Sequence, residues 1–227
     1  PLDYISIYIR IIDIYKNSDD FTFYNKIKAL RNFENMLDLQ KNVALERIFF
    51  HTYQAELEFL IFNDKISDAL QLMQTIDKNL KENKFTIEPY YFVEMYYQFA
   101  CLFLANNNLS KSLKFINTIL NEFSIEDRPK TFVKTEILNL IIHYELKNYK
   151  LVLNKFSTLK KKYQKSFNLN EIEKKLLNTI IKLATNPYGI NERVSFQKLI
   201  KKIDKIESID KTSSNKIYLN YINKKKN

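Results

Sequence analysis

Glycine is almost absent from this chain of 227 residues, which holds one glycine and four prolines. Ordinary proteins use these residues at roughly 7% and 5% of positions. Because tight hairpin turns depend on them, their scarcity argues against a sheet protein and favours long helices with brief connections. Phosphate-binding loops also need glycines, so Gly189 alone excludes both G-x-G-x-x-G and P-loop motifs.

Cysteine occurs once and tryptophan does not occur. Cys101 cannot form an internal disulfide, and no signal peptide opens the sequence, so we expect a cytoplasmic protein. The longest apolar runs, such as residues 99–105, are shorter than the ~20 residues that cross a bilayer, so no transmembrane segment is expected. The first residue, Pro1, fits either removal of an initiator Met or excision from a longer protein.

Apolar residues recur at three- and four-residue spacings along almost the whole chain, and this period is typical of helices. We therefore expect an all-α protein, folded as a single domain over residues 1–227. The sequence predicts helices at about 2–17, 20–39, 43–62, 65–83, 89–106, 109–123, 130–147, 149–166, 170–185, 192–208 and 214–223. Pro89 and Pro129 fit first-turn positions. The left-handed cap conformation that glycine usually takes is assigned to Asn63, Asn106 to Asn108, Asn148 and Asn186.

The predicted helical hairpins repeat. Three second helices share a pattern of core positions, in which Ala69, Ser112 and Val152 are equivalent and lie 43 and 40 positions apart. The first helices match too: Tyr53, Leu57 and Leu60 correspond to Tyr96, Ala100 and Phe103, with Leu140 and His143 in the third copy. A shared pattern of this kind predicts stacked, similar units.

This pattern resembles the tetratricopeptide repeat, most closely in Tyr96-x-x-Phe99-Ala100-x-x-Phe103 followed by Asn107-x-Leu109-x-x-Ser112. The match covers about residues 43–166, with degenerate hairpins on either side. The spacing is longer than the ~34 residues of that family, so the repeats are elongated variants. The resemblance implies a right-handed α-solenoid of about five antiparallel helical hairpins, a superhelix whose usual work is to bind peptides or proteins.

No catalytic apparatus is recognisable. The two histidines, His51 and His143, have no neighbouring ligands at metal-site spacing, so we expect no metal site and no cofactor. Cys101 lies in an apolar run and is interpreted as core. Acid pairs such as Glu56 and Glu58 are interpreted as solvated or helix N-terminal residues. We expect a protein that is not an enzyme, although an enzyme of unfamiliar type stays open.

Aromatic residues cluster between positions 90 and 103. Phe92, Tyr96, Phe99 and Phe103 share one predicted helical face and are interpreted as core. Tyr90 and Tyr97 lie off that face and are candidate contacts for a partner.

Charge is distributed unevenly. Residues 1–149 hold 17 lysines and arginines against 20 acidic residues, net −3, whereas residues 150–227 hold 19 against 6, net +13. Two predicted helices concentrate the lysines on the side opposite their apolar residues. The candidate partner-binding lysines are Lys155, Lys161, Lys162, Lys165, Lys198, Lys201, Lys202 and Lys205.

Two functions follow as hypotheses, with ordinary solvated helix faces as the plain alternative. The first is a protein or peptide scaffold whose concave face binds an unidentified partner. The second is binding of a polyanion, such as nucleic acid or an acidic surface, by the basic region 150–227, with affinity that falls as salt rises. Arg193 is the only arginine after position 150, so nucleic-acid binding would involve mostly the backbone.

Overall fold

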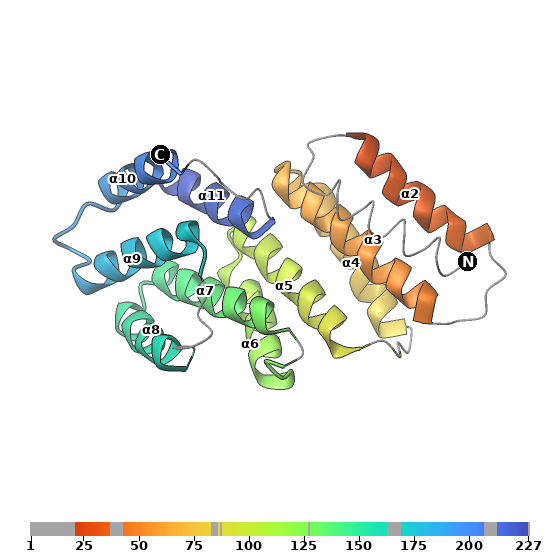
Figure 1. Cartoon of the computed structure of the whole chain (residues 1–227), viewed down its shortest axis with the longest axis horizontal. Helices are drawn as coiled ribbons and strands as arrows, with labels where there is room; N and C mark the ends of the chain where they lie inside the picture. Colours follow the sequence, from red (N-terminus) through yellow and green to blue (C-terminus); the bar gives the residue numbers. More distant parts are fainter. Residues whose placement is uncertain are drawn as a thin grey trace. The chain divides into compact units, whose positions relative to one another are not determined.

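The computed structural model describes residues 21–36, 43–82, 86, 88–126, 128–162, 169–206 and 213–226. Every regular element within these ranges is an α-helix, which confirms the all-α prediction (Figure 1). The predicted helix at 2–17 lies outside the described residues. The helices are α2 (Phe21–Met36), α3 (Val43–Phe62), α4 (Ile66–Glu82), α5 (Pro89–Ala105), α6 (Leu109–Glu122), α7 (Pro129–Glu145), α8 (Tyr149–Lys162), α9 (Glu171–Thr185), α10 (Glu192–Ile203) and α11 (Ser213–Lys225).

Most helix boundaries agree with the sequence prediction. Helix α3 begins and ends at the predicted residues, and Pro89 and Pro129 are the first residues of α5 and α7. Helix α10 is the exception, because it ends at Ile203 rather than at 208. The amide of Ile206 donates to the carbonyl of Ile203 at 2.8 Å, so a tight turn replaces the last predicted turn of helix.

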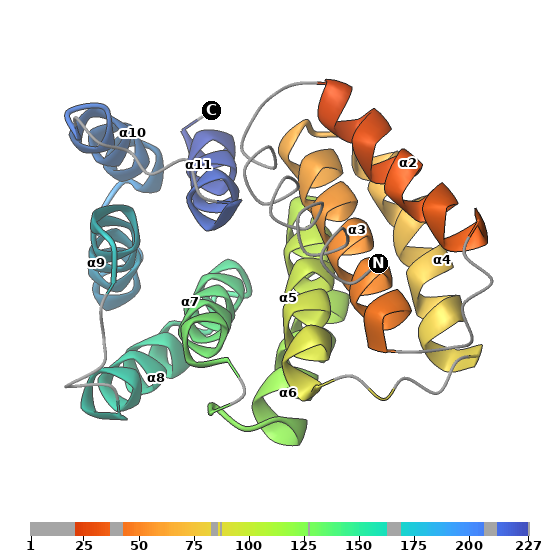
Figure 2. The same ribbon diagram turned by 45° about the vertical axis from the view of Figure 1, so that its right-hand side comes forward.

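The chain divides into two compact units, Pro1–Asn106 and Asn107–Asn227. In unit 1, α3 packs against α2, α4 and α5. In unit 2, each helix packs against the next one along the chain, and α9 also contacts α7 and α11, so that α9 lies between α8 and α10 (Figure 2). The expected single domain stays a prediction.

Three helix connections share the same backbone geometry. Asp64, Asn107 and Lys147 adopt the left-handed conformation, with φ of 55°, 56° and 60°. These residues lie 43 and 40 positions apart, which is the spacing of the predicted repeat. The predicted left-handed position is correct only at Asn107. It is one residue off at Asn63 and Asn148, and the backbone of Asn186 has φ −137° and is not left-handed.

The first and third of these connections are Schellman turns, and this explains the shift of one residue. The amide of Lys65 donates to the carbonyl of Leu60, and that of Asn148 donates to the carbonyl of His143, both at 2.9 Å. In such a turn the left-handed residue stands immediately before the one that closes the long bond. Five residues after each left-handed residue stands an anchor of the repeat, and the anchors Ala69, Ser112 and Val152 are all fully buried. The repeat register predicted from the sequence thus coincides with a repeated structure.

Helix α5 is buried around most of its circumference. Phe99 and Phe103 are buried as predicted, but Phe92 and Tyr96 from the same stripe are only half-buried. Tyr97, which lies off the stripe, is only 2% exposed. Nearly every residue of this helix is apolar or aromatic, and a helix that is apolar all round is buried all round. A single packed stripe was therefore too narrow a prediction for α5.

Two acidic side chains on α3 are buried, and their interpretation as solvated groups was wrong. Glu56 and Glu58 are each 4% exposed. Glu56 forms an ion pair with Arg31 of α2, and Glu58 accepts a hydrogen bond from the side-chain amide of Gln98 on α5 at 2.5 Å. Because α3 contacts α2 and α5 as well as α4, residues two positions apart both meet a neighbouring helix.

Candidate functional site

The two units carry opposite net charges. Unit 1 contains 11 lysines and arginines against 15 acidic residues, net −4, and unit 2 contains 25 against 11, net +14. The positive charge of the chain is therefore concentrated in unit 2. Its helix α8 contains no acidic residue, and α10 contains only Glu192.

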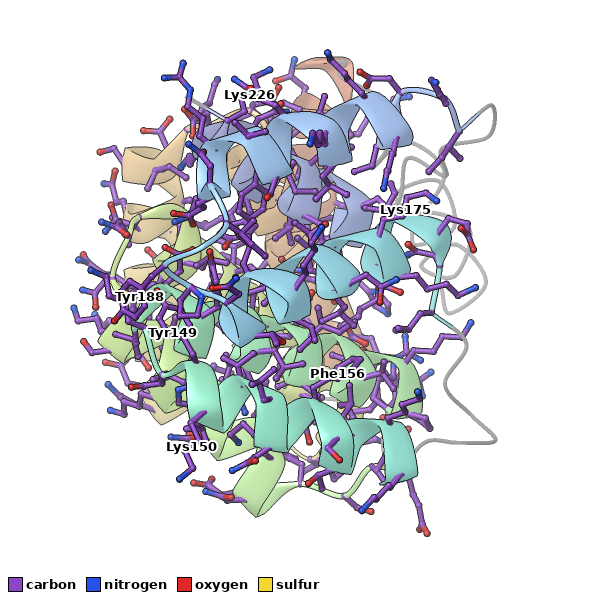
Figure 3. All side chains as sticks on the ribbon, turned by 90° about the vertical axis from the view of Figure 1, so that its left-hand side faces the viewer. Tyr149, Lys150, Phe156, Lys175, Tyr188 and Lys226 are labelled. Atoms are coloured by element: carbon purple, nitrogen blue, oxygen red, sulfur yellow. The ribbon has the colours of Figure 1, made fainter. Side chains whose placement is uncertain are left out.

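Exposed lysines gather on three neighbouring helices of unit 2, and we call this set the basic face. It consists of Lys150, Lys160 and Lys161 on α8, Lys174 and Lys182 on α9, and Lys198, Lys201 and Lys202 on α10. Helix α9 contacts α7, α8, α10 and α11, so its exposed stripe occupies the one side left open, which faces the viewer in Figure 3. The α9 lysines therefore lie between the two helices that the sequence had singled out.

Most of this charge has no nearby acidic partner. Lys174 forms an ion pair with Glu171 at 3.0 Å, and that carboxylate also lies 3.6 Å from Lys175. Both the bond and the charge of Lys174 lower the pKa of Glu171. For Lys198, Lys201, Lys202 and Lys205, the described part of the chain offers no carboxylate within ion-pair distance. Among the described residues, the positive charge of these four lysines is therefore not neutralised by ion pairs.

The predicted lysines are not equivalent. Lys161 and the four lysines from 198 to 205 are exposed, as the helical pattern predicted. Lys155 is half-buried. Burial of the His143 ring lowers the pKa of that histidine, and the positive charge of Lys155 lowers it further. The side chain of Lys162 and all of Lys165 lie outside the described residues.

The sequence prediction missed the lysines of α9. Lys174, Asn178 and Lys182 are spaced at i, i+4 and i+8, and all three are exposed. This polar stripe was readable from the sequence, opposite the buried Leu176 and Ile180. Glu171 and Glu173 reduce the net charge of α9, so lysines are less concentrated there than on α8 and α10.

The two tyrosines predicted as partner contacts are placed differently. Tyr90 is half-buried and stacks on Tyr91, with ring centroids 4.0 Å apart. Burial, followed by the hydrogen bond to Tyr91, raises the pKa of Tyr90. Tyr97 is a buried residue of α5 and does not present a surface to a partner, which corrects the prediction for this position.

A cluster of polar side chains joins α7, α10 and α11, and we call it the polar clamp; no local pattern in the sequence predicts it. The hydroxyl of Tyr144 donates to Glu192 at 3.0 Å, and that of Tyr221 donates to Glu145 at 2.5 Å. Lys225 lies 2.7 Å from Glu145 and 3.2 Å from Glu192. Helix α11, which the sequence predicts at 214–223, continues to Lys225 and buries Tyr218 and Ile222.

The clamp changes the acidity of its members. Burial is the main cause that raises the pKa values of Tyr144 and Tyr221, and the carboxylates of Glu192 and Glu145 raise them further. Burial alone would lower the pKa of Lys225, but its bond to Glu145 and the two carboxylate charges outweigh this effect and raise it. At neutral pH the cluster therefore holds protonated phenols and an ammonium between two carboxylates.

The residues considered for catalysis or metal binding are dispersed. His51 packs edge-on against Tyr91 with centroids 5.5 Å apart, and Nδ1 of His143 lies 3.4 Å from the amide nitrogen of Asn148. Cys101 is buried. Within the described ranges, histidine, cysteine and acidic side chains form no group of three that would hold a metal ion. None of the helices in those ranges has both the length and the apolarity needed to cross a membrane.

Comparison of the chain with protein-family models found no matching family, and comparisons with curated proteins and with solved structures found no match either.

Proposed function

We propose that the chain is a non-enzymatic interaction module built from tetratricopeptide-like hairpins, a right-handed α-solenoid in type, whose unit 2 binds an acidic segment of a partner protein. The observation that carries this proposal is the basic face, where lysines from three adjacent helices are exposed and those of α10 form no ion pair with a carboxylate of the described ranges. The left-handed turns and the buried anchors follow the same two spacings along the chain, which supports a repeat architecture.

Lysine is suited to this kind of recognition. Its ammonium group is a flexible point charge, so a row of lysines attracts carboxylates or phosphates without requiring one fixed geometry. Exposed charges also act at a distance of about 8 Å at physiological salt, which accelerates the encounter with an acidic segment. The resulting complex is expected to weaken markedly as salt rises.

Nucleic acid is the second candidate, and the same lysines favour it. Arg193 is the only arginine after position 150, which limits contact to the phosphate backbone. Tyr188 is the only fully exposed aromatic residue within the described ranges, and it lies on the α9–α10 connection rather than on the basic face. Stacking on bases would therefore contribute little there, and an acidic protein segment is the better-supported ligand.

The test compares binding of two probes to the full chain at several salt concentrations. One probe is a labelled glutamate-rich peptide, and the other is a labelled mixed-sequence DNA duplex. We expect the peptide to bind and the double variant Lys198→Glu/Lys202→Glu to weaken binding by about tenfold or more, because two attractive charges become repulsive. The matched control is Lys111→Glu/Lys114→Glu on α6, which changes the net charge of unit 2 equally at two exposed sites away from the basic face.

The outcomes separate the candidates. Peptide binding that is lost in the α10 variant and kept in the α6 control supports the proposal. Binding of DNA alone, with the same dependence on Lys198 and Lys202, would favour the second candidate. Equal losses in both variants would show that only the net charge of unit 2 matters, and the basic face would then have no specific role.

A further inference from the structure

One edge of unit 2 brings together three helix ends. The polar clamp ties the last turn of α7 to the first residue of α10 and to the last turn of α11. Beside it, Nε of Arg193 donates to the carbonyl oxygen of Lys226 at 3.2 Å. Tyr149, Lys150 and Tyr188 lie at this same end of the helices, and Lys175 lies at the opposite end (Figure 3). We call this edge, formed by residues 144–151, 187–194 and 221–226, the hairpin-tip edge.

Exposed apolar side chains gather at this edge. Tyr188 is 96% exposed, and Leu146, Leu151 and Val194 are 41%, 39% and 41% exposed. In the described part of the chain, the large hydrophobic side chains that are exposed are these four. Isolated exposed apolar residues are normal on a protein surface, but their restriction to one edge indicates an interaction site.

The other two left-handed turns show which residues can stand at the positions of Leu146 and Leu151. Leu146 precedes the left-handed residue Lys147, and the equivalent residues of the other two turns are Asn63 and Asn106. Leu151 follows four residues after Lys147, where the other turns have Asp68 and Lys111. All four of these polar side chains are exposed. The turn therefore forms equally well with polar residues, and its geometry does not explain the leucines.

The same edge is positively charged. It carries Lys147, Lys150 and Arg193, all exposed, together with the three lysines at positions 224–226. Its two acidic residues, Glu145 and Glu192, are bonded within the polar clamp to Tyr221, Tyr144 and Lys225. The clamp thus neutralises the two carboxylates of the edge, and Lys147, Lys150 and Arg193 form no ion pair with another part of the described chain.

We infer that the hairpin-tip edge docks on an anionic lipid bilayer. Tyrosine and aliphatic side chains are stabilised at the boundary between headgroups and acyl chains, and lysine and arginine are attracted to the negative headgroups. The four apolar side chains project from connections and from first turns of helices, so a broad, planar surface can reach them together. Nucleic acid would satisfy the cations but would gain little from Leu146 or Val194.

This docking is peripheral and distinct from recognition by the basic face, with which the edge shares Lys150 alone. It combines a few shallow apolar contacts with electrostatic attraction, so neither part alone gives stable attachment. Binding is therefore expected to need anionic lipid and to weaken as salt rises. The two surfaces would allow one module to hold an acidic partner protein near a membrane.

The experiment measures sedimentation of the full chain with vesicles of phosphatidylcholine alone and with about one third phosphatidylserine. The key variant is Leu146→Asn/Leu151→Lys, which copies the residues of the α5–α6 turn and therefore preserves the fold. It adds one positive charge, so a purely electrostatic attachment would strengthen. We expect the opposite, a loss of about tenfold or more in binding to the anionic vesicles, because the apolar contacts are removed.

Two further measurements keep this test separate from the acidic-peptide test. The variant Lys198→Glu/Lys202→Glu should keep vesicle binding within about threefold of the parent chain, because Lys198 and Lys202 lie outside the edge. The variant Leu146→Asn/Leu151→Lys should keep peptide binding. Absence of binding to anionic vesicles at low salt, or unchanged binding in the leucine variant, would overturn the inference. Loss of peptide binding in the leucine variant, without any vesicle binding, would instead make the edge a protein-docking surface and would also overturn it.

Discussion

Units 1 and 2 use similar helical hairpins but place their charged residues in opposite ways. Unit 1 has a net charge of −4 and buries two glutamates of α3 between helices, each with a partner on another helix. Unit 2 has a net charge of +14 and exposes most of its lysines on α8, α9 and α10. Two of its carboxylates, Glu145 and Glu192, bind Lys225 of the last helix, and the one glutamate that it buries, Glu173, belongs to the capping box at the start of α9 within the described ranges.

This difference separates charges that maintain the fold from charges that are available to a partner. A buried carboxylate has lost its water, so it must be paired, and removal of its partner is costly. An exposed lysine keeps its water and costs little, so its position is free to serve binding. The predictions below test this separation, in order of decreasing effect.

The largest effect is expected from Arg31→Met in unit 1. Arg31 pairs with Glu56, donates from Nε to the hydroxyl of Thr52 at 3.1 Å, and lies 3.7 Å from the ring centroid of Tyr53. Its loss leaves a buried carboxylate unpaired, so we expect the free energy of unfolding in urea to fall by about 3–5 kcal/mol. Replacing both charges, in Arg31→Met/Glu56→Met, should restore most of this loss.

The control is an exposed pair in the same unit. Arg47 lies 3.5 Å from Glu88, and both side chains are about half exposed. Arg47→Met should therefore cost less than about 1 kcal/mol. An equal loss of unfolding free energy in the two arginine variants would mean that burial of Glu56 does not distinguish the two ion pairs. The proposed difference between buried, paired charges and exposed charges would then be wrong.

A smaller effect is expected from Lys225→Met in unit 2. This change leaves the half-buried Glu145 without its ammonium partner, although the bond from Tyr221 stays in place. We expect the free energy of unfolding to fall by about 1–3 kcal/mol. Lys224→Met removes an exposed lysine from the same helix and should change stability by less than about 0.5 kcal/mol.

The polar clamp also predicts a dependence on alkaline pH. The pKa values of Tyr144, Tyr221 and Lys225 are raised in the folded chain, so the folded state keeps protons that the unfolded state releases above about pH 10. The stabilisation that these three groups contribute is therefore fully present below about pH 10 and is lost as the pH rises above it. Melting temperatures measured from neutral to alkaline pH should fall less steeply in Lys225→Met/Tyr221→Phe. A parallel fall in the parent chain and this variant would show that the clamp does not control alkaline stability.

Local patterns in the sequence predicted the helices and the repeat spacing well. The period of apolar residues located α3 at both of its ends, and the anchors at 69, 112 and 152 proved equivalent in the structure. Both features depend on residues a few positions apart, and such relations are visible in a single sequence. The exposed lysines of α10 were found in the same way, because they lie opposite Phe196 and Leu199.

The polar clamp and the buried glutamates were not predictable by this route. Tyr221 and Glu145 are 76 positions apart, and Glu58 and Gln98 are 40 apart. Which residues meet at such distances depends on how the helices pack, and no local period records it. Tyr97 was misplaced for a related reason, since a helix with neighbours on several sides has no single buried stripe. The hairpin-tip edge became visible only when three sequence-distant helix ends were found together.

The smallest predicted effect concerns the turns that both units share. The single glycine of the chain is not used in a left-handed position, so Asp64, Asn107 and Lys147 take that conformation instead. A left-handed backbone costs ordinary residues about 1–2 kcal/mol, and asparagine and aspartate tolerate it best. Lys147→Gly should therefore raise the free energy of unfolding by about 0.5–1 kcal/mol, whereas Asn107→Gly should raise it least. Glycine keeps the amide that donates to the carbonyl of Tyr144 at 2.9 Å, so the turn itself is preserved. A larger gain at Asn107 than at Lys147 would contradict this prediction, because the same backbone conformation would then cost asparagine more than lysine.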